Sequence, residues 1–387
     1  MDKNWKPAWR YQVIDFGEPI GDLSGITQQT TILCPVSGSG VRILFDNSLN
    51  AAAMGLEHVI LKTADAEVAV TLHGTENITL QPGERIFSDP AYLPVRSGKR
   101  LCVEICFREA REITGLCQTW AARSWQTVFQ KSNGTTADCT EIMPWLGKDV
   151  HKPTVSCGFS QLDIFTEEDV RTVAMFGDSI THMSYYSDAL LERLISEYRG
   201  KAVLANAGIG GNRLCFDASI APDLGVHSSV FGHAGYKRFE EDVFGTMRPN
   251  TVLMLEGIND VTHGFQYGRM DQLPTSEEFC QRYSDVIACA HRHGARILIG
   301  TIIPENVFRD EEWFTLSEKL RLEINEWIRR QKLADGVIDF ETLAADACGN
   351  LKKGFHMDDL HPNEAGGKEM ASLVPLEEVL RYGEYGR

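Results

Sequence analysis

The pattern of hydrophobic and polar positions changes near residue 168. Before that point, short runs rich in β-forming residues are separated by Gly, Pro, Asn and Asp, and helical periodicity is hard to find. Such runs predict strands; they are "GVRILFDN" (40–47), "HVILKTAD" (58–65), "EVAVTLHG" (67–74), "NITLQPGERIFSD" (77–89) and "KRLCVEICF" (99–107). Strands at this spacing predict an all-β sandwich or jelly-roll domain, which we place at residues 1–167.

In the second half, continuous apolar runs alternate with segments whose apolar residues have helical spacing. The runs predict strands at 170–177, 201–209, 251–260, 295–304 and 336–340. The intervening segments predict helices at 184–198, 276–294 and 316–332, the second with Ser276 as its cap and Gly294 as its stop. This alternation predicts an α/β domain over residues 168–387, with a five-stranded parallel sheet covered on both faces.

A long polar connection with three tryptophans, residues 119–153, joins the two patterns. It is compatible with a flap over a site and equally with packing between the domains. The role of the β-rich half also stays open: it is compatible with shaping one wall of a site, binding glycan or mediating assembly into a homo-oligomer.

Polar residues at the ends of the predicted parallel strands are the candidates for chemistry, because ligands of open parallel sheets bind at the carboxyl ends of the strands. Four fragments occupy such positions: Gly177-Asp178-Ser179, "NAGIGGNR" (206–213), Gly257-Ile258-Asn259-Asp260, and Asp358-x-x-His361 within "HMDDLHPNEAGG" (356–367).

Each fragment has a simpler interpretation when it is taken alone. Ser179 is a favourable helix cap, and Asn259-Asp260 is compatible with a turn. His361 is compatible with a surface histidine. The glycines of "GIGG" fail the dinucleotide-binding pattern, because Arg213 stands where the third glycine belongs.

Together the fragments supply the parts of a serine hydrolase. A neutral serine hydroxyl is a poor nucleophile and requires a base, which His361 offers. Asp358, three residues earlier, is placed to orient the imidazole. The amides of Ser179 and Gly211 and the side chain of Asn259 offer donors for an oxyanion.

These four fragments, in this order, resemble the four blocks of the SGNH, or GDSL, hydrolase superfamily; the first reads G-D-S-I here. The resemblance implies a three-layer, flavodoxin-like hydrolase domain. It assigns Ser179 as nucleophile, His361 as base and acid, and Asp358 as its partner. Ser179, Gly211 and Asn259 would form the oxyanion hole.

"FGDSIT", "NAGIGGNRL", "LEGIND" and "DLHPNEAG" resemble especially a bacterial subgroup that carries a β-rich domain before the hydrolase domain. The resemblance extends over roughly residues 20–375 and includes "VRILFDNSL" and "LQPGERIFSDP". This subgroup is associated with removing acetyl groups from carbohydrates.

One departure from the subgroup lies three residues after Ser179. An acidic residue followed by glycine is frequent there, whereas this chain has His182-Met183. His182 and His356 therefore compete with His361 for the role of base. We favour His361, because His182 is too close along the first helix to reach the Ser179 hydroxyl, and His356 lacks the D-x-x-H spacing.

Net charge and cysteine usage narrow the classes of binding partner and the cellular location that we expect. The chain of 387 residues has a formal net charge of −16, which argues against binding nucleic acid or anionic membrane. The N-terminus lacks the apolar core of a signal peptide, and no run is long enough to span a membrane. The ten cysteines are scattered, with no CxxC pair, so we expect free thiols and a cytoplasmic location.

The sequence thus predicts a serine esterase that hydrolyses short acyl esters, acetyl esters of carbohydrates first, and needs no metal or organic cofactor. Its substrate would be a small-molecule or oligosaccharide ester. The alternatives are a general short-chain carboxylesterase, a lysophospholipase-like hydrolase, and a glycan-binding module whose hydrolase fold is inactive. Degenerate members usually lose the serine or the histidine, whereas Ser179 and His361 are both present.

Overall fold

The computed structural model describes residues 4–144, 152–218 and 228–381, which fall into two compact units. The first comprises residues 1–170 together with 194–205, and the second comprises residues 171–193 and 206–387. The boundary expected between residues 167 and 168 stays a prediction, because the segment 194–205 groups with the first unit by its contacts.

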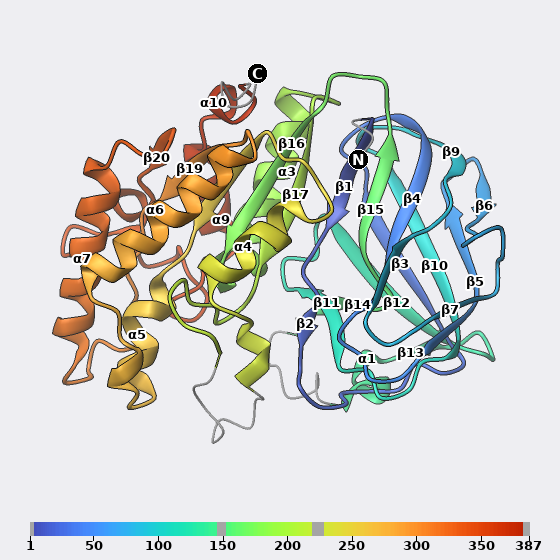
Figure 1. Cartoon of the computed structure of the whole chain (residues 1–387), viewed down its shortest axis with the longest axis horizontal. Coiled ribbons are helices and arrows are strands. Elements are labelled where there is room, and N and C mark those ends of the chain that lie inside the picture. The colour runs from blue at the N-terminus through green and yellow to red at the C-terminus, as the bar shows by residue number, and fades with distance from the viewer. Residues whose placement is uncertain (1–3, 145–151, 219–227, 382–387) are drawn as a thin grey trace. The chain divides into compact units, whose positions relative to one another are not determined.

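The first unit is built almost entirely of antiparallel strands (Figure 1). One sheet has the order β1 (Trp5–Arg10), β15 (Phe159–Phe165), β4 (Gly38–Asn47) and β8 (Glu84–Phe87), with β9 (Ala91–Val95) also paired to β4. A larger sheet has the order β13 (Thr136–Ala137), β12 (Trp125–Lys131), β3 (Ile26–Leu33), β10 (Arg100–Glu109), β5 (Met54–Lys62) and β6 (Glu67–Ala69), with β7 (Ile78–Leu80) on β5. A small third sheet joins β14 (Thr154–Ser156), β11 (Gly115–Thr119) and β2 (Ile14–Asp15).

Aromatic side chains fill the space between the two larger sheets. Trp9 on β1 makes an edge contact with Trp125 on β12, with ring centroids 5.4 Å apart. Trp9 also lies 4.8 Å from the ring of Phe159 on β15. All three side chains are almost fully buried. The two sheets therefore share one apolar core, and the expected all-β region is confirmed.

The segment 119–153 differs from the polar connection that we expected. Its middle forms β12, which pairs with β3 across seven residues, and Trp125 is fully buried. It continues into β13 and the short helix α1 (Cys139–Ile142). Most of this segment is thus part of the first unit's own core and sheet, so a flap across its whole length is wrong; residues 145–151 lie outside the described residues.

A five-stranded sheet has the order β17 (Ala202–Gly208), β16 (Arg171–Gly177), β18 (Thr251–Leu255), β19 (Arg296–Gly300) and β20 (Gly336–Ile338). All of it belongs to the second unit except residues 202–205 of β17, which group with the first. The strand pairs β16–β18, β18–β19 and β19–β20 are parallel. The strands are buried almost throughout, as expected for a sheet covered on both faces. The order 2-1-3-4-5 is flavodoxin-like, so the predicted fold class is confirmed.

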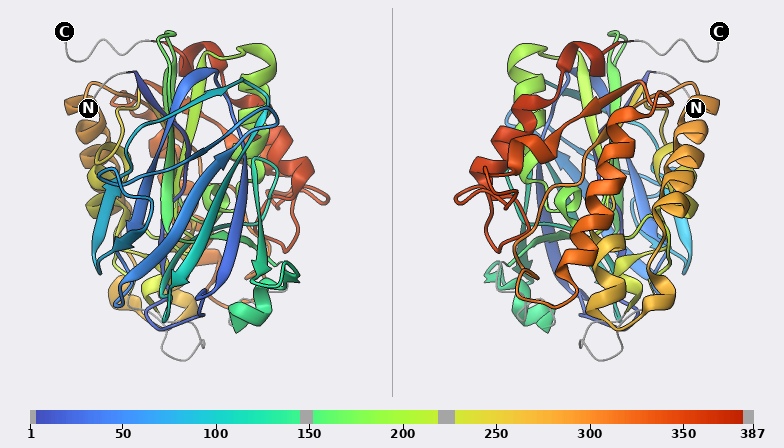
Figure 2. Two further views of the ribbon diagram at one scale, coloured as in Figure 1. Left: turned by 90° about the vertical axis from the view of Figure 1, so that its right-hand side faces the viewer. Right: turned by 90° about the vertical axis from the view of Figure 1, so that its left-hand side faces the viewer.

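Helices cover both faces of this sheet, as the two side views show (Figure 2). The major helices are α3 (Tyr185–Glu197), α4 (Gly235–Phe244), α5 (Ile258–Gln266), α6 (Ser276–Arg292), α7 (Phe314–Arg330) and α9 (Glu364–Leu373). Shorter ones are α2 (Ser179–His182), α8 (Phe340–Ala344), α10 (Leu376–Val379) and the 3₁₀ turns η3 (Ser228–Phe231) and η4 (Met270–Gln272).

Two details of the second unit differ from expectation. Thr275, rather than Ser276, caps α6: its hydroxyl accepts the Glu278 amide while the Glu278 carboxylate accepts the Thr275 amide, which is a capping box. The strand expected at 251–260 ends at Leu255, and α5 begins at Ile258, so Asn259 stands in the first turn of a helix rather than in a loop.

All ten cysteines are free, as expected from their scattered positions. Within the described ranges, no helix is both long and apolar enough to cross a bilayer.

Candidate active site

The site lies in the second unit, at the carboxyl ends of β16 and β18. These neighbouring strands are the point where the strand order reverses, the place at which doubly wound sheets bind ligands. Directly after β16, the Asp178 carboxylate accepts the Ile180 amide at 3.0 Å and caps α2. Ser179 is therefore the first residue of a helix, and capping falls to Asp178 instead of Ser179.

A chain of hydrogen bonds links Ser179, His361 and Asp358. The His361 Nε2 atom lies 2.7 Å from the Ser179 Oγ atom, and its Nδ1 atom lies 2.7 Å from the Asp358 Oδ2 atom. A carboxylate only accepts, so Nδ1 carries the proton and donates it to Asp358. Nε2 is then the acceptor for the serine hydroxyl, which is the orientation that a general base requires.

Asp358 is held as an anion. Burial alone would raise the pKa of this carboxyl group, but the hydrogen bond and charge of the His361 ring and the amides of His361 and Leu360 lower its pKa to about 2. The His361 amide donates to Asp358 Oδ1 at 2.7 Å. The D-x-x-H spacing thus produces one compact turn in which the carboxylate binds both the ring and the backbone of the same histidine.

Three donors gather beside the Ser179 hydroxyl. The amides of Ser179 and Gly211 have no hydrogen-bond partner among the residues that the structure describes. Asn259, 5% exposed, donates one N–H of its side chain to the Asn212 carbonyl at 2.8 Å, which leaves the second N–H for a ligand. Ser179, Gly211 and Asn259 line one cavity.

Gly211 is the residue that its position requires. Its φ angle of 72° is in the left-handed region that favours glycine. A Cβ atom at this position would also overlap the ring of Phe231 in η3. The loop after β17 can therefore turn its amide toward the site only with glycine here.

The two competing histidines make other bonds. The His182 Nδ1 atom accepts the Gly210 amide at 3.0 Å, and this side chain is buried. The His356 Nδ1 atom accepts the Asp359 amide at 2.9 Å. Of the three rings, the one that lies against the Ser179 hydroxyl is that of His361.

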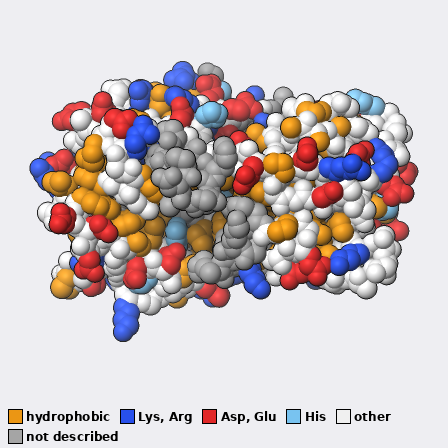
Figure 3. Space-filling model, turned by 90° about the horizontal axis from the view of Figure 1, so that it is seen from below, with side chains coloured by type: hydrophobic (Ala, Val, Ile, Leu, Met, Phe, Trp, Pro, Cys, Tyr) orange, Lys and Arg blue, Asp and Glu red, His pale blue; other side chains and the backbone are white. Residues whose placement is uncertain are grey.

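The cavity beside Ser179 has a volume of about 230 Å³. Its lining, which lies in the second unit, consists of Ser179, Gly211, Ile258, Asn259, Thr262, His263, Gln266, Tyr267, Glu305, Phe308, Leu360 and His361. Hydrophobic side chains gather on the second unit in the view from below, toward the left of Figure 3. Small-molecule pockets commonly measure about 300–1,000 Å³, so this cavity is a small one.

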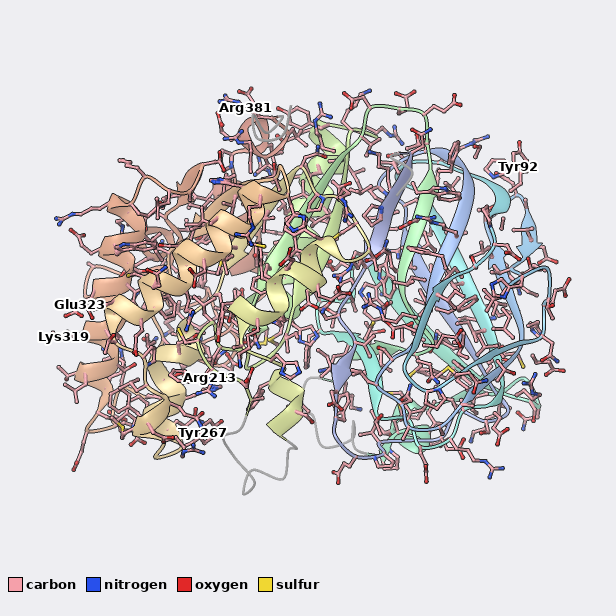
Figure 4. All side chains as sticks on the ribbon, in the orientation of Figure 1. Tyr92, Arg213, Tyr267, Lys319, Glu323 and Arg381 are labelled. Carbon is pink, nitrogen blue, oxygen red and sulfur yellow. The ribbon has the colours of Figure 1, made fainter. Side chains whose placement is uncertain are left out.

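Two ionisable residues of this lining were not predicted from the sequence. His263 on α5 is 6% exposed and Glu305 is 3% exposed. Burial, together with the charge of Arg213, lowers the pKa of His263 to about 3, so the ring is neutral near pH 7. Arg213 and Tyr267 are labelled at this end of the unit in Figure 4. Glu305 follows the apolar run of β19, so the strand-end rule that identified Ser179 also points to it.

Two aromatic side chains line the cavity, those of Tyr267 and Phe308. Phe265 and Trp313 stack on each other with centroids 5.2 Å apart. Tyr186 is buried against Phe340.

Behind the serine lie three buried carboxyl groups, those of Asp178, Glu256 and Asp260. Burial raises the pKa of Asp178 to about 7 and that of Asp260 to about 6, against the hydrogen bonds that each accepts from backbone amides. Asp260 accepts the amides of Leu214 and Cys215 at 2.7 and 2.9 Å, which ties the loop after β17 to the first turn of α5.

Potential metal ligands cluster elsewhere. Two groups of three occur in the described part of the chain, Glu57 with His58 and Cys106, and Glu240 with Cys289 and His293. Neither group includes a residue that lines the cavity.

We next compared the chain with known proteins and protein families. The model of the GDSL-like lipase/acylhydrolase family matches residues 175–368, half of the chain. No curated protein matches the sequence.

Two similar solved structures align with about half of the chain. One is LAE5, an alpha/beta hydrolase enzyme from the metagenome of Lake Arreo, with 20% identity, a TM-score of 0.41, and coverage of 54% of this chain and 94% of that one. The other is a catalytic mutant of Axe2, an acetylxylan esterase from Geobacillus stearothermophilus, with 17% identity, a TM-score of 0.42, and coverage of 57% and 99%. On the family match, which includes Ser179, Gly211, Asn259, Asp358 and His361, this chain belongs to the GDSL-like lipase/acylhydrolase family.

Proposed function

We propose that this protein is a serine esterase that removes short acyl groups, acetyl foremost, from carbohydrate esters through an acyl-enzyme. The observation that carries the proposal is the hydrogen-bonded chain from the Ser179 hydroxyl through the His361 ring to the Asp358 carboxylate, with 2.7 Å at each step. Nucleophile, base and orienting group within hydrogen-bond reach are what this chemistry requires.

In the first half of the reaction, the Ser179 Oγ atom attacks the ester carbonyl while His361 Nε2 takes the hydroxyl proton. The tetrahedral oxyanion accepts hydrogen bonds from the amides of Ser179 and Gly211 and from the Asn259 side chain. Collapse of the intermediate breaks the bond to the alcohol oxygen, and His361 returns the proton to the leaving alcohol.

In the second half, water replaces the alcohol. His361 takes a proton from the water as its oxygen attacks the acyl-serine, and the same donors hold the second oxyanion. His361 then protonates Ser179 Oγ, which releases the carboxylic acid. Asp358, as an anion, keeps the Nδ1 proton in place and stabilises the imidazolium that forms in each half.

The acyl and alcohol parts of the substrate are inferred separately. The small cavity supports a short acyl group. Phe308 and Tyr267 in its wall support an alcohol with a ring whose C–H face can lie on an aromatic side chain. The free cysteines support action in a reducing compartment such as the cytoplasm, on small oligosaccharides.

The experiment is to measure acetate release from acetylated xylo- and manno-oligosaccharides, beside p-nitrophenyl esters of increasing chain length. Ser179→Ala is the control. We expect acetate release that is lost in the variant, and aryl-ester rates that fall as the acyl chain lengthens.

The outcomes separate the candidate functions. Activity on aryl esters alone would support the chemistry but refute a carbohydrate substrate, in favour of a general carboxylesterase. Rates that rise with chain length would favour a lysophospholipase-like enzyme. Absence of any Ser179-dependent activity, with oligosaccharide still bound, would favour the inactive glycan-binding module.

A further inference from the structure

A buried carboxylate stands in the wall of the cavity, outside the catalytic chain. Glu305 lines the same cavity as Ser179 and His361. It lies in the irregular segment after β19 and is 3% exposed. The proposed reaction gives this carboxylate no task.

The hydrogen-bonding capacity of Glu305 is only half used. Its Oε2 atom accepts the Phe308 amide at 2.9 Å. Its Oε1 atom is buried and has no hydrogen-bond partner among the described residues. Buried polar atoms without a partner are rare in native proteins, and a water or ligand commonly supplies the missing bond.

The protein offers no cation for this oxygen within the cavity. The described residues that line it include neither lysine nor arginine. Burial raises the pKa of Glu305, while the amides of Phe308 and Val307 and the charge of Arg309, which does not line the cavity, oppose that shift. The Oε1 atom thus belongs to a cavity-lining side chain and is left to accept a hydrogen bond from a bound molecule.

The groups around Glu305 narrow the class of that donor. The Phe308 backbone fixes the carboxylate, while the Phe308 side chain lines the same cavity. His263, a neutral ring near pH 7, presents a buried Nδ1 atom that also lacks a hydrogen-bond partner in the described part of the chain. An acceptor, an aromatic side chain and a neutral imidazole together suit an uncharged ligand with several hydroxyl groups better than an acyl chain.

We propose that Glu305 is a specificity-determining residue, which accepts a hydrogen bond from a free hydroxyl of the leaving alcohol next to the ester. This inference rests on the proposed esterase function and deepens it. The favoured substrates are monoesters of vicinal diols, as in partly acetylated sugars, rather than esters of simple alcohols. The unused acceptor would then be satisfied only when such an alcohol is bound.

The test compares Glu305→Gln with the wild type on three acetyl esters. They are a monoacetylated methyl xyloside with a free neighbouring hydroxyl, the analogue in which that hydroxyl is replaced by hydrogen, and p-nitrophenyl acetate. The amide oxygen of the variant can still accept the Phe308 amide, while its NH₂ group replaces the acceptor Oε1 by a donor. Glu311→Gln is the matched control, since Glu311 is an exposed glutamate of the same connecting segment and does not line the cavity.

For Glu305→Gln we expect kcat/KM on the hydroxyl-bearing ester to fall about 10- to 100-fold. The deoxy analogue and p-nitrophenyl acetate should change less than about threefold, which also shows that the variant is folded. Wild-type enzyme should prefer the hydroxyl-bearing ester over the deoxy one by a similar factor, and Glu311→Gln should behave as wild type.

Two results would overturn the inference. One is an equal loss on all three esters, which would mean that Glu305 acts only through packing. The other is measured on a fourth acetyl ester, 2-(dimethylamino)ethyl acetate, which is protonated at neutral pH: a selective loss on this ester, without a loss on the xyloside, would mean a site for a cation. In both cases Ser179-dependent ester hydrolysis by the wild type persists, whereas failure of the proposed function would remove it.

Discussion

The Nδ1 atom of His182 accepts a hydrogen bond of 3.0 Å from the Gly210 amide. Because Nδ1 is an acceptor, it carries no proton in this arrangement. His182 thereby joins α2, which begins at Ser179, to the loop that presents the Gly211 amide. We therefore expect the histidine that departs from the subgroup's pattern to position the proposed oxyanion donors.

We expect His182→Phe to lower kcat by about tenfold, less than the ~100- to 1000-fold typical for removing an oxyanion donor outright. KM should change little, since the interaction matters most when charge develops on the oxyanion. His182→Asn, which keeps an acceptor near the position of Nδ1, should recover part of the rate. Steady-state kinetics on p-nitrophenyl acetate test this; equal kcat in the Phe and Asn variants would refute the positioning role.

Gly211→Ala should lose both stability and activity. The left-handed conformation costs an alanine about 1–2 kcal/mol, and the new Cβ atom would displace the Phe231 ring. Gly349→Ala is the matched control, because Gly349 has a φ angle of 78° but open space around its Cβ position. Urea unfolding should show a larger loss for Gly211→Ala, and kcat should fall only in that variant. Equal effects in both variants would contradict the assigned role of Gly211.

His361→Ala should reduce kcat more than Asp358→Ala does. Loss of a general base typically lowers the rate about 100- to 10,000-fold. Removal of Asp358 leaves the base, His361, in place and removes only the hydrogen-bond partner of its Nδ1 atom. Rates for the two single variants and the double variant decide the order; a larger loss for Asp358→Ala would reverse the assignment.

The buried Asp178 carboxyl group predicts a pH-dependent stability. Burial raises the pKa of Asp178 to about 7, above the ~3.9 of an unfolded aspartate. Between these values the native state binds more protons than the unfolded state, so this group's contribution is fully present below pH ~3.9 and is lost as pH rises through 7. Asp178→Asn removes that loss, since the amide oxygen can still accept the Ile180 amide.

Urea unfolding at pH 5 and pH 7.5 tests the sign. The free energy of unfolding should fall less over this interval in Asp178→Asn than in the wild type. Asp310→Asn, at an exposed aspartate of the same unit, serves as the control. A pH dependence that is unchanged by Asp178→Asn would contradict the prediction.

The parallel sheet was predictable because its strands are buried on both faces and therefore read as continuous apolar runs. The helix α5 was not, since "GIND" is rich in turn residues, and only the structure shows Asp260 binding the backbone of the neighbouring loop. The fifth strand, β20, was predicted near its true position. The fourth strand, β19, is shorter than the predicted run at 295–304, because it ends at Gly300.

In the first unit, β3 and β15 escaped prediction because polar residues occupy buried positions. Gln28 on β3 is fully buried, and its amide group binds the backbone of Cys157 in both directions. Gln161 and Asp163 on β15 are likewise buried, with Asp163 paired to Arg42. From the sequence alone, such polar positions suggest exposed residues. The sequence does not show the distant partner that satisfies each buried polar group.

The positions of the predicted site residues follow from one rule: ligands of open parallel sheets bind at the carboxyl ends of the strands. This rule does not depend on the conformation of the surrounding loops. Glu305 follows a strand end but was not singled out from the sequence, and neither was His263, because a lone acidic residue or histidine carries no motif. Their significance depends on burial and on the unused hydrogen-bonding atoms that the fold gives them.

The most direct test of the account is to treat the wild-type protein with a fluorophosphonate that mimics the tetrahedral intermediate, and to map the adduct by mass spectrometry. We predict a single adduct on Ser179, absent from Ser179→Ala and formed much more slowly in His361→Ala. Labelling at another residue, or labelling whose rate is unchanged in His361→Ala, would contradict the claim that Ser179 is a nucleophile activated by His361.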